Sequence, residues 1–120
     1  MLRSALSIFV FVGLFHFLLP EVTFSQGETT SAIVGQVRDA SDAAVPNATV
    51  IVTNKETGLK RSAKTDDSGR FNFPQLKPGA YSVKVEAEGF EPQQNDAVSS
   101  SLGRKQTVDF RLKIAVKPDR

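Results

Sequence analysis

The amino-acid sequence predicts a small all-β domain, a sandwich or a barrel, and three observations carry that prediction. Short runs of alternating apolar and polar residues recur about every ten to fifteen residues beyond residue 31. Clusters of Gly, Pro, Asn, Asp and Ser separate these runs, as turns do in all-β proteins. No segment shows the spacing of an amphipathic helix. A chain of 120 residues has room for one such domain.

The first element is a signal peptide. Arg3 supplies a positive charge, residues 5–19 are apolar apart from Ser7 and His16, and Pro20 ends the apolar run. We therefore assign residues 1–25 to a signal peptide and residues 26–31 to a flexible lead-in.

The expected cleavage site lies between Ser25 and Gln26, or one residue later. Thr23 and Ser25 are small enough for the pockets of a signal peptidase. A membrane anchor is the alternative, but the apolar run is shorter than the ~20 residues a spanning helix needs, and it contains Gly13. We therefore expect an exported chain, in the periplasm, at the outer membrane or secreted, with no stable membrane span after cleavage.

Composition then excludes several kinds of chemistry. The only histidine, His16, lies in the leader, and the chain has no Cys and no Trp. Ser-His-Asp and Cys-His catalysis are therefore excluded after cleavage, as are disulfides and a histidine-bound zinc. A Ser-Lys pair at Ser62 or Ser82 remains as a remote enzymatic alternative. The formal net charge is +2, and basic residues are interspersed with acidic ones, so no nucleic-acid partner is expected.

The first three strands are expected at residues 32–38, 48–54 and 60–65. In the second, Val50 and Val52 point to one face, and the intervening residues point to the other. The third is polar and is expected at a sheet edge, where basic side chains discourage aggregation.

The connection at residues 65–69 is expected to be a tight hairpin, with Gly69 free to adopt a positive φ. Strands follow at residues 70–74 and 80–87. Their apolar stripes, Phe71 with Phe73 and Tyr81 with Val83 and Val85, are expected to form the centre of the core.

The remaining elements complete a count of about seven strands. Phe90 is expected to cover one end of the domain, and Pro92 to interrupt strand pairing. Residues 97–102 form the weakest strand candidate. The last strand, residues 106–114, is expected to place Val108, Phe110, Leu112 and Ile114 on one face. The domain therefore spans residues 32–114, and residues 115–120 form a tail.

The stretch from Thr65 to Tyr81 reads T-D-D-S-G-R-F-N-F-P-Q-L-K-P-G-A-Y, and it resembles the signature of the carboxypeptidase regulatory-like domain family. The resemblance extends over about residues 32–113. Physical chemistry accounts for its residues as turn formers and core side chains. These motif residues are Asp66, Gly69, Phe71, Phe73, Leu76, Pro78, Gly79 and Tyr81.

The resemblance implies a transthyretin-like (prealbumin-like), seven-stranded Greek-key β-sandwich without catalytic activity. Such domains are appendages of metallocarboxypeptidases and form the N-termini of bacterial TonB-dependent receptors. The chain is then either a stand-alone envelope module or the front part of a larger receptor, and the sequence leaves both open.

The leading functional hypothesis is protein interaction with an envelope protein or a neighbouring domain. Lys60, Arg61 and Lys64 form the only basic cluster, and their edge strand is the candidate contact. Carbohydrate binding with a starch-binding-like fold is the alternative, although the domain has a single Tyr and no Trp. No cofactor, catalytic or metal site is predicted.

A calcium site is a minor alternative to turn capping. It would use Asp66 and Asp67, with Asp39 or Asp42, because turns rich in carboxylates bind hard cations. No EF-hand spacing follows these residues, so turn capping is favoured.

Overall fold

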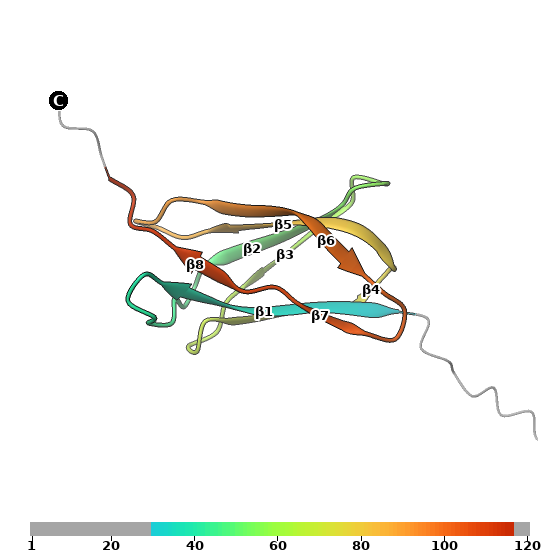
Figure 1. Cartoon of the computed structure of the whole chain (residues 1–120), viewed down its shortest axis with the longest axis horizontal. Helices are drawn as coiled ribbons and strands as arrows, with labels where there is room; N and C mark the ends of the chain where they lie inside the picture. The colour runs from blue at the N-terminus through green and yellow to red at the C-terminus, as the bar shows by residue number, and fades with distance from the viewer. Residues whose placement is uncertain (1–29, 117–120) are drawn as a thin grey trace, which may run out of the picture.

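The computed structural model describes residues 30–116, which form two stacked sheets without a helix (Figure 1). The all-β sandwich is therefore confirmed. Its strands are β1 (Ser31–Asp39), β2 (Thr49–Asn54), β3 (Lys60–Lys64), β4 (Arg70–Leu76), β5 (Gly79–Glu86), β6 (Gln93–Ser100), β7 (Lys105–Thr107) and β8 (Phe110–Leu112). The signal peptide and its cleavage site lie outside the described residues. Within residues 30–116 no helix is long and apolar enough to cross a membrane.

One sheet has the order β3-β2-β5-β6, and each of its pairings is antiparallel. The other has the order β4-β1-β7, with β8 also paired to β1. Here β4 is antiparallel to β1, whereas β7 and β8 are parallel to it. The Greek-key classification stays a prediction from the resemblance.

The core lies where the two sheets face each other. Both predicted apolar stripes are in it: Phe71 and Phe73 from β4 and Tyr81, Val83 and Val85 from β5 are buried in one cluster. Alternation along β2 is also confirmed, since Val50 and Val52 are buried, whereas Thr49, Ile51 and Thr53 are half-buried. Phe90 packs against this cluster as predicted.

The predicted seven strands become eight because the last one is interrupted. Val108, Phe110 and Leu112 are buried as expected, but residues 106–114 contain the separate strands β7 and β8. At the break, Asp109 Oδ1 accepts a hydrogen bond of 3.0 Å from the Gln36 N–H of β1, so a side chain replaces a ladder bond. The placement of Ile114 on the buried face is wrong, because its side chain is 71% exposed.

The predicted hairpin at residues 65–69 is also wrong. The turn is tight, since the Asp66 N–H donates to the Arg70 carbonyl at 3.0 Å, but it joins β3 to β4 in the opposite sheet. The reason is Gly69, whose carbonyl accepts a hydrogen bond of 2.7 Å from the Val37 N–H of β1. The chain is therefore led into pairing with β1 rather than back along β3.

Candidate interaction surface

β3 ends its sheet and has β2 as its single strand partner, which confirms the prediction of an edge strand. Lys60, Arg61 and Lys64 are all exposed there. In Figure 1, β3 and the edge strand β4 lie along the same side of the sandwich. That this edge contacts a partner stays a prediction.

The side chains of the basic cluster lie on both faces of the sheet. Arg61 is opposite buried Val52, and its Nη1 donates to the Pro74 carbonyl oxygen of β4 at 2.8 Å. Its guanidinium carbon lies 5.8 Å from the centroid of the Phe73 ring. Lys60 and Lys64 instead lie opposite half-buried residues of β2, on the outer face of the sheet.

The turn residues of the motif act as the sequence analysis expects. Asp66 Oδ1 accepts hydrogen bonds of 2.9 Å from the N–H groups of Ser68 and Arg70. Gly69 has a φ of 75°, and an added Cβ would lie 2.4 Å from the Val37 carbonyl oxygen. A side chain at position 69 would therefore push β4 away from β1.

The other motif residues belong to the core and to the next turn. Phe71, Phe73, Leu76 and Tyr81 are buried, and the Tyr81 hydroxyl donates to the Lys77 carbonyl oxygen, which fixes the turn containing Pro78 and Gly79.

Thr65, at the start of the motif, has a role that sequence reasoning missed. It is buried, and its Oγ1 accepts a hydrogen bond of 2.9 Å from the Ala48 N–H and donates one of 2.7 Å to the Val45 carbonyl oxygen. This hydroxyl therefore takes the place of a strand partner for the segment entering β2. The available signal was a Thr at a position of the same parity as Arg61 and Ala63, whose side chains lie on the inner face.

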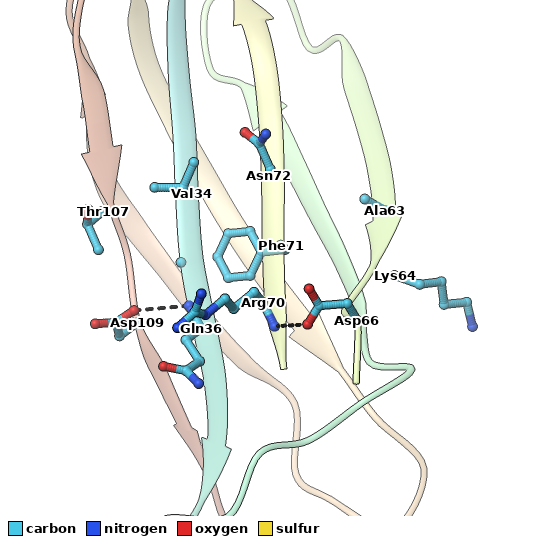
Figure 2. A pocket seen from close by; sticks show the side chains of 11 residues that line it. Val34, Gln36, Ala63, Lys64, Asp66, Arg70, Phe71, Asn72, Thr107 and Asp109 are labelled. Atoms are coloured by element: carbon cyan, nitrogen blue, oxygen red, sulfur yellow. Dashed lines mark hydrogen bonds between the residues drawn. The ribbon is translucent and has the colours of Figure 1, made fainter. Parts of the chain in front are cut away.

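A groove of about 550 Å³ runs from the β4-β1-β7 sheet to the β3 edge (Figure 2). Figure 2 shows the Phe71 ring at its floor between β1 and β4, with Lys64 and Ala63 on one side and Asp109 on the other. Its polar lining mixes both signs of charge with amide and hydroxyl groups. The polar residues are Gln36, Lys64, Asp66, Arg70, Asn72, Thr107 and Asp109.

A second, smaller hollow of about 170 Å³ opens at the other end of β3. Arg61 and Leu59 line it from the β3 side, and Leu76 and Tyr81 line it from β4 and β5. Leu59 is 73% exposed, so the rim presents a large apolar side chain to solvent. The two hollows therefore flank the same edge strand.

Three of the four carboxylates considered for calcium, those of Asp39, Asp42 and Asp66, accept hydrogen bonds. Asp39 Oδ1 accepts from the Ser41 hydroxyl at 2.7 Å and from the N–H groups of Ser41 and Ala43 at 2.9 and 3.0 Å. The Ser41 hydroxyl, followed by the Ala43 N–H, lowers the pKa of Asp39 below its ordinary value of 3.8. Asp42 pairs with Arg111 at 2.9 Å. Among residues 30–116 no three acidic or histidine side chains gather into a metal site.

Family comparison covers the whole sandwich, since the model of the carboxypeptidase regulatory-like domain matches residues 32–113. The chain belongs to the carboxypeptidase regulatory-like domain family. A curated relative of this family member is the TonB-dependent transporter Oar of Myxococcus xanthus, which is 35% identical over 85 residues. That alignment covers 69% of this chain and 8% of Oar, so the chain spans a small part of its relative.

Solved structures show the same sandwich in proteins with different activities. A Bacteroides uniformis protein described as carbohydrate-binding matches with a TM-score of 0.56 and 16% identity, covering 68% of this chain and 40% of the other. Catechol 1,2-dioxygenase from an Acinetobacter species also matches with a TM-score of 0.56, at 14% identity, covering 81% of this chain and 59% of the enzyme. At such identities the likeness establishes the fold alone.

Proposed function

We propose that this chain is a non-catalytic accessory domain, exported to the bacterial envelope, that contacts other proteins through the free edge of β3. The observation that carries the proposal is an edge strand that bears three cations and lies beside two hollows. The similarity to part of the transporter Oar supports an envelope location and a place at the front of a TonB-dependent receptor.

Site-directed photocrosslinking in the producing cell tests this proposal. A photoreactive amino acid at Lys60 is expected to give a crosslinked protein, and one at Ser99 on β6 is expected to give none. Both residues are exposed on edge strands of the same sheet, so they differ in the edge they report. Equal crosslinking at both positions, or at neither, contradicts the proposal.

Export is tested separately by intact-mass measurement of the mature protein. We expect a chain that begins at Gln26, because Thr23 and Ser25 suit a signal peptidase. Recovery of envelope protein that still begins at Met1 would contradict the signal peptide.

Carbohydrate binding is the second candidate, supported by the amide, hydroxyl and carboxylate groups that line the 550 Å³ groove. Sugar-binding surfaces commonly stack sugar rings on aromatic side chains. In the described part of the chain Phe71, Phe73, Tyr81 and Phe110 are buried and Phe90 is half-buried, which favours the protein-interaction proposal. Retardation of the domain in polysaccharide affinity gels, abolished by Asn72→Ala, would instead favour the carbohydrate.

A further inference from the structure

The backbone of β3 has unused hydrogen-bonding groups along its outer side. In the ladder with β2, the Asn54 N–H donates to the Leu59 carbonyl at 2.8 Å, and the Thr65 N–H donates to the Ala48 carbonyl at 2.9 Å. Bonded pairs alternate in an antiparallel ladder, so Arg61 and Ala63 supply the bonds in between. The N–H and C=O groups of the other three β3 residues, Lys60, Ser62 and Lys64, therefore point away from β2.

Side chains on this strand divide in the same alternating way. Lys60, Ser62 and Lys64 are exposed on the outer face, in register with Thr53, Ile51 and Thr49 of β2. Arg61 and Ala63 lie on the inner face, opposite buried Val52 and Val50. A strand added along this edge would follow the same alternation, with every second side chain turned inward.

Each inner position of β3 borders one of the hollows. Arg61 lines the 170 Å³ hollow, whose walls include Val52, Leu76 and Tyr81. A cavity of about 150 Å³ accepts a group the size of benzene, so this hollow has room for one apolar side chain. Ala63 lines the groove above the Phe71 ring. Two inward side chains of an added strand would therefore meet two separate recesses.

The charge of the edge selects the outward side chains of such a strand. The ion pairs among the described residues are Lys84 with Glu86 and Arg111 with Asp42, so they leave the β3 cations out. Lys60 and Lys64 are four residues apart on the outer face, and residues directly opposite each other in a sheet interact. Acidic side chains at matching positions would face both lysines, whereas basic ones would be repelled.

We propose that β3 binds an extended protein segment as an added strand, with acidic side chains facing Lys60 and Lys64 and two small aliphatic side chains turned toward the hollows. Main-chain hydrogen bonds to Lys60, Ser62 and Lys64 hold the segment, and the recesses beside Arg61 and Ala63 select its inward residues. This inference rests on the proposed function, because it specifies how the same edge engages its partner.

The probe is the capped peptide Thr-Glu-Val-Thr-Val-Glu-Thr, which reads the same in both directions and therefore presents the pattern in either orientation. Its control is Thr-Lys-Val-Thr-Val-Lys-Thr. By fluorescence anisotropy we expect the glutamate peptide to bind the chain at least about tenfold more tightly than the lysine peptide. Equal affinities, or no binding of the glutamate peptide at about 1 mM, would overturn the proposal.

Amide hydrogen exchange reports the strand itself. With saturating glutamate peptide, we expect at least about tenfold slower exchange at Lys60, Ser62 and Lys64 and little change at Arg61 and Ala63, whose N–H groups already bond to β2. Binding without this alternating protection would mean charge attraction alone and would refute strand addition.

Proline variants test whether peptide binding depends on the β3 edge. Ser62→Pro removes the central outward N–H, which proline at an edge permits, and is expected to weaken binding at least about tenfold. Ser99→Pro on β6, at the opposite edge of the sheet, is the matched control and is expected to leave binding unchanged. If Ser62→Pro does not fold, N-methylated peptides test the reciprocal bonds donated by the segment. N-methylation of the central threonine removes the bond to the Ser62 carbonyl in an antiparallel segment, and N-methylation of both valines removes the bonds to the β3 carbonyls in a parallel one. Unchanged affinity for both peptides contradicts the proposal.

Failure of this inference is distinguishable from failure of the proposed function. Crosslinking of a protein at Lys60 without protected amides at Ser62 would retain the interaction edge and reject strand addition. Loss of the crosslink would reject the interaction edge itself.

Discussion

The two sheets of this sandwich satisfy their backbone groups in different ways. In the β3-β2-β5-β6 sheet, three antiparallel ladders pair the backbone N–H and C=O groups of the inner strands, and the groups without a strand partner lie along the sheet edges. In the β4-β1-β7 sheet, pairing is mixed and interrupted, and the Asp109 side chain fills a gap in the ladder. The comparison indicates why the candidate contact lies on β3: its ladder with β2 is unbroken, and its outward backbone groups lie at the border of the sheet, where a partner has access.

A crowding substitution should lower stability most in the β4-β1-β7 sheet, whose pairing is interrupted. A Cβ at Gly35 of β1 would lie 1.8 Å from the Val108 carbonyl oxygen and 2.5 Å from the Phe71 ring. We expect Gly35→Ala to lower the free energy of unfolding by about 3 kcal/mol, because backbone and ring must both shift. Urea unfolding measures this, with Ser62→Ala in the regular sheet expected to change stability by less than about 0.5 kcal/mol. Similar values for the two variants would remove the contrast between the sheets.

The connection from β3 to β4, which crosses between the sheets and begins at Thr65, should be the next most sensitive to substitution. Thr65→Val keeps the shape of a buried side chain but leaves the Ala48 N–H and the Val45 carbonyl without the hydroxyl that satisfies both. A buried unsatisfied group costs about 2 kcal/mol, and we expect a loss of that size.

Thr53→Val is the matched control for this crossover. Thr53 lies half-buried on the outer face of β2, so its substitution should change stability by less than about 0.5 kcal/mol. Thermal or urea unfolding compares the two, and equal effects would show that the Thr65 bonds do not hold the crossover.

The sequence predicts the regular sheet better than the interrupted one, for physical reasons. Alternation of apolar residues along β2 and β5 of the regular sheet reports which face is buried, and burial decides the core. Alternation alone carries no information about which strand pairs with which. The turn at residues 65–69 was correctly expected to be tight, yet its assignment as a hairpin failed because the Gly69 carbonyl bonds to Val37, a contact between distant parts of the chain.

The split of the last strand had the same origin. Val108, Phe110 and Leu112 keep the alternation of one continuous strand, so the pattern could not show that Asp109 takes the Gln36 N–H. The basic edge was predictable, since a polar run that contains three cations suits an edge strand. The inward turn of Arg61 toward Phe73 and the two hollows required the structure.

A smaller loss of stability is expected at Asp109, whose side chain accepts the hydrogen bond of the Gln36 N–H in place of a backbone carbonyl. Asp109→Ala frees the exposed Gln36 N–H, and we expect a loss of about 1 kcal/mol because water compensates in part. Exchange of the Gln36 amide should become faster in the variant. Asp96→Ala on β6, which removes a side-chain bond to Gln94 and no ladder bond, is the control and should stay within about 0.5 kcal/mol of the parent. Unchanged Gln36 exchange in Asp109→Ala would contradict the role of this carboxylate.

The smallest effect concerns the turn after β1 and depends on pH. Hydrogen bonds from Ser41 and Ala43 hold the pKa of Asp39 below 3.8 in the folded state, so the ionised carboxylate stabilises the fold above the unfolded-state pKa. That contribution is lost as the pH falls through 3.8 toward the lower folded-state value. Asn at position 39 accepts the same bonds without a charge that titrates.

The difference in melting temperature between the parent chain and Asp39→Asn should therefore be larger at pH 6 than at pH 3. Ser41→Ala removes the hydroxyl that lowers the pKa of Asp39 most. When this substitution is introduced into both the parent chain and Asp39→Asn, their difference in melting temperature should depend less on pH. A difference that stays constant between the two pH values would mean that the charge of Asp39 adds nothing to the turn. The end of β1 would then be held by the geometry of its backbone, as the ladders of the regular sheet are.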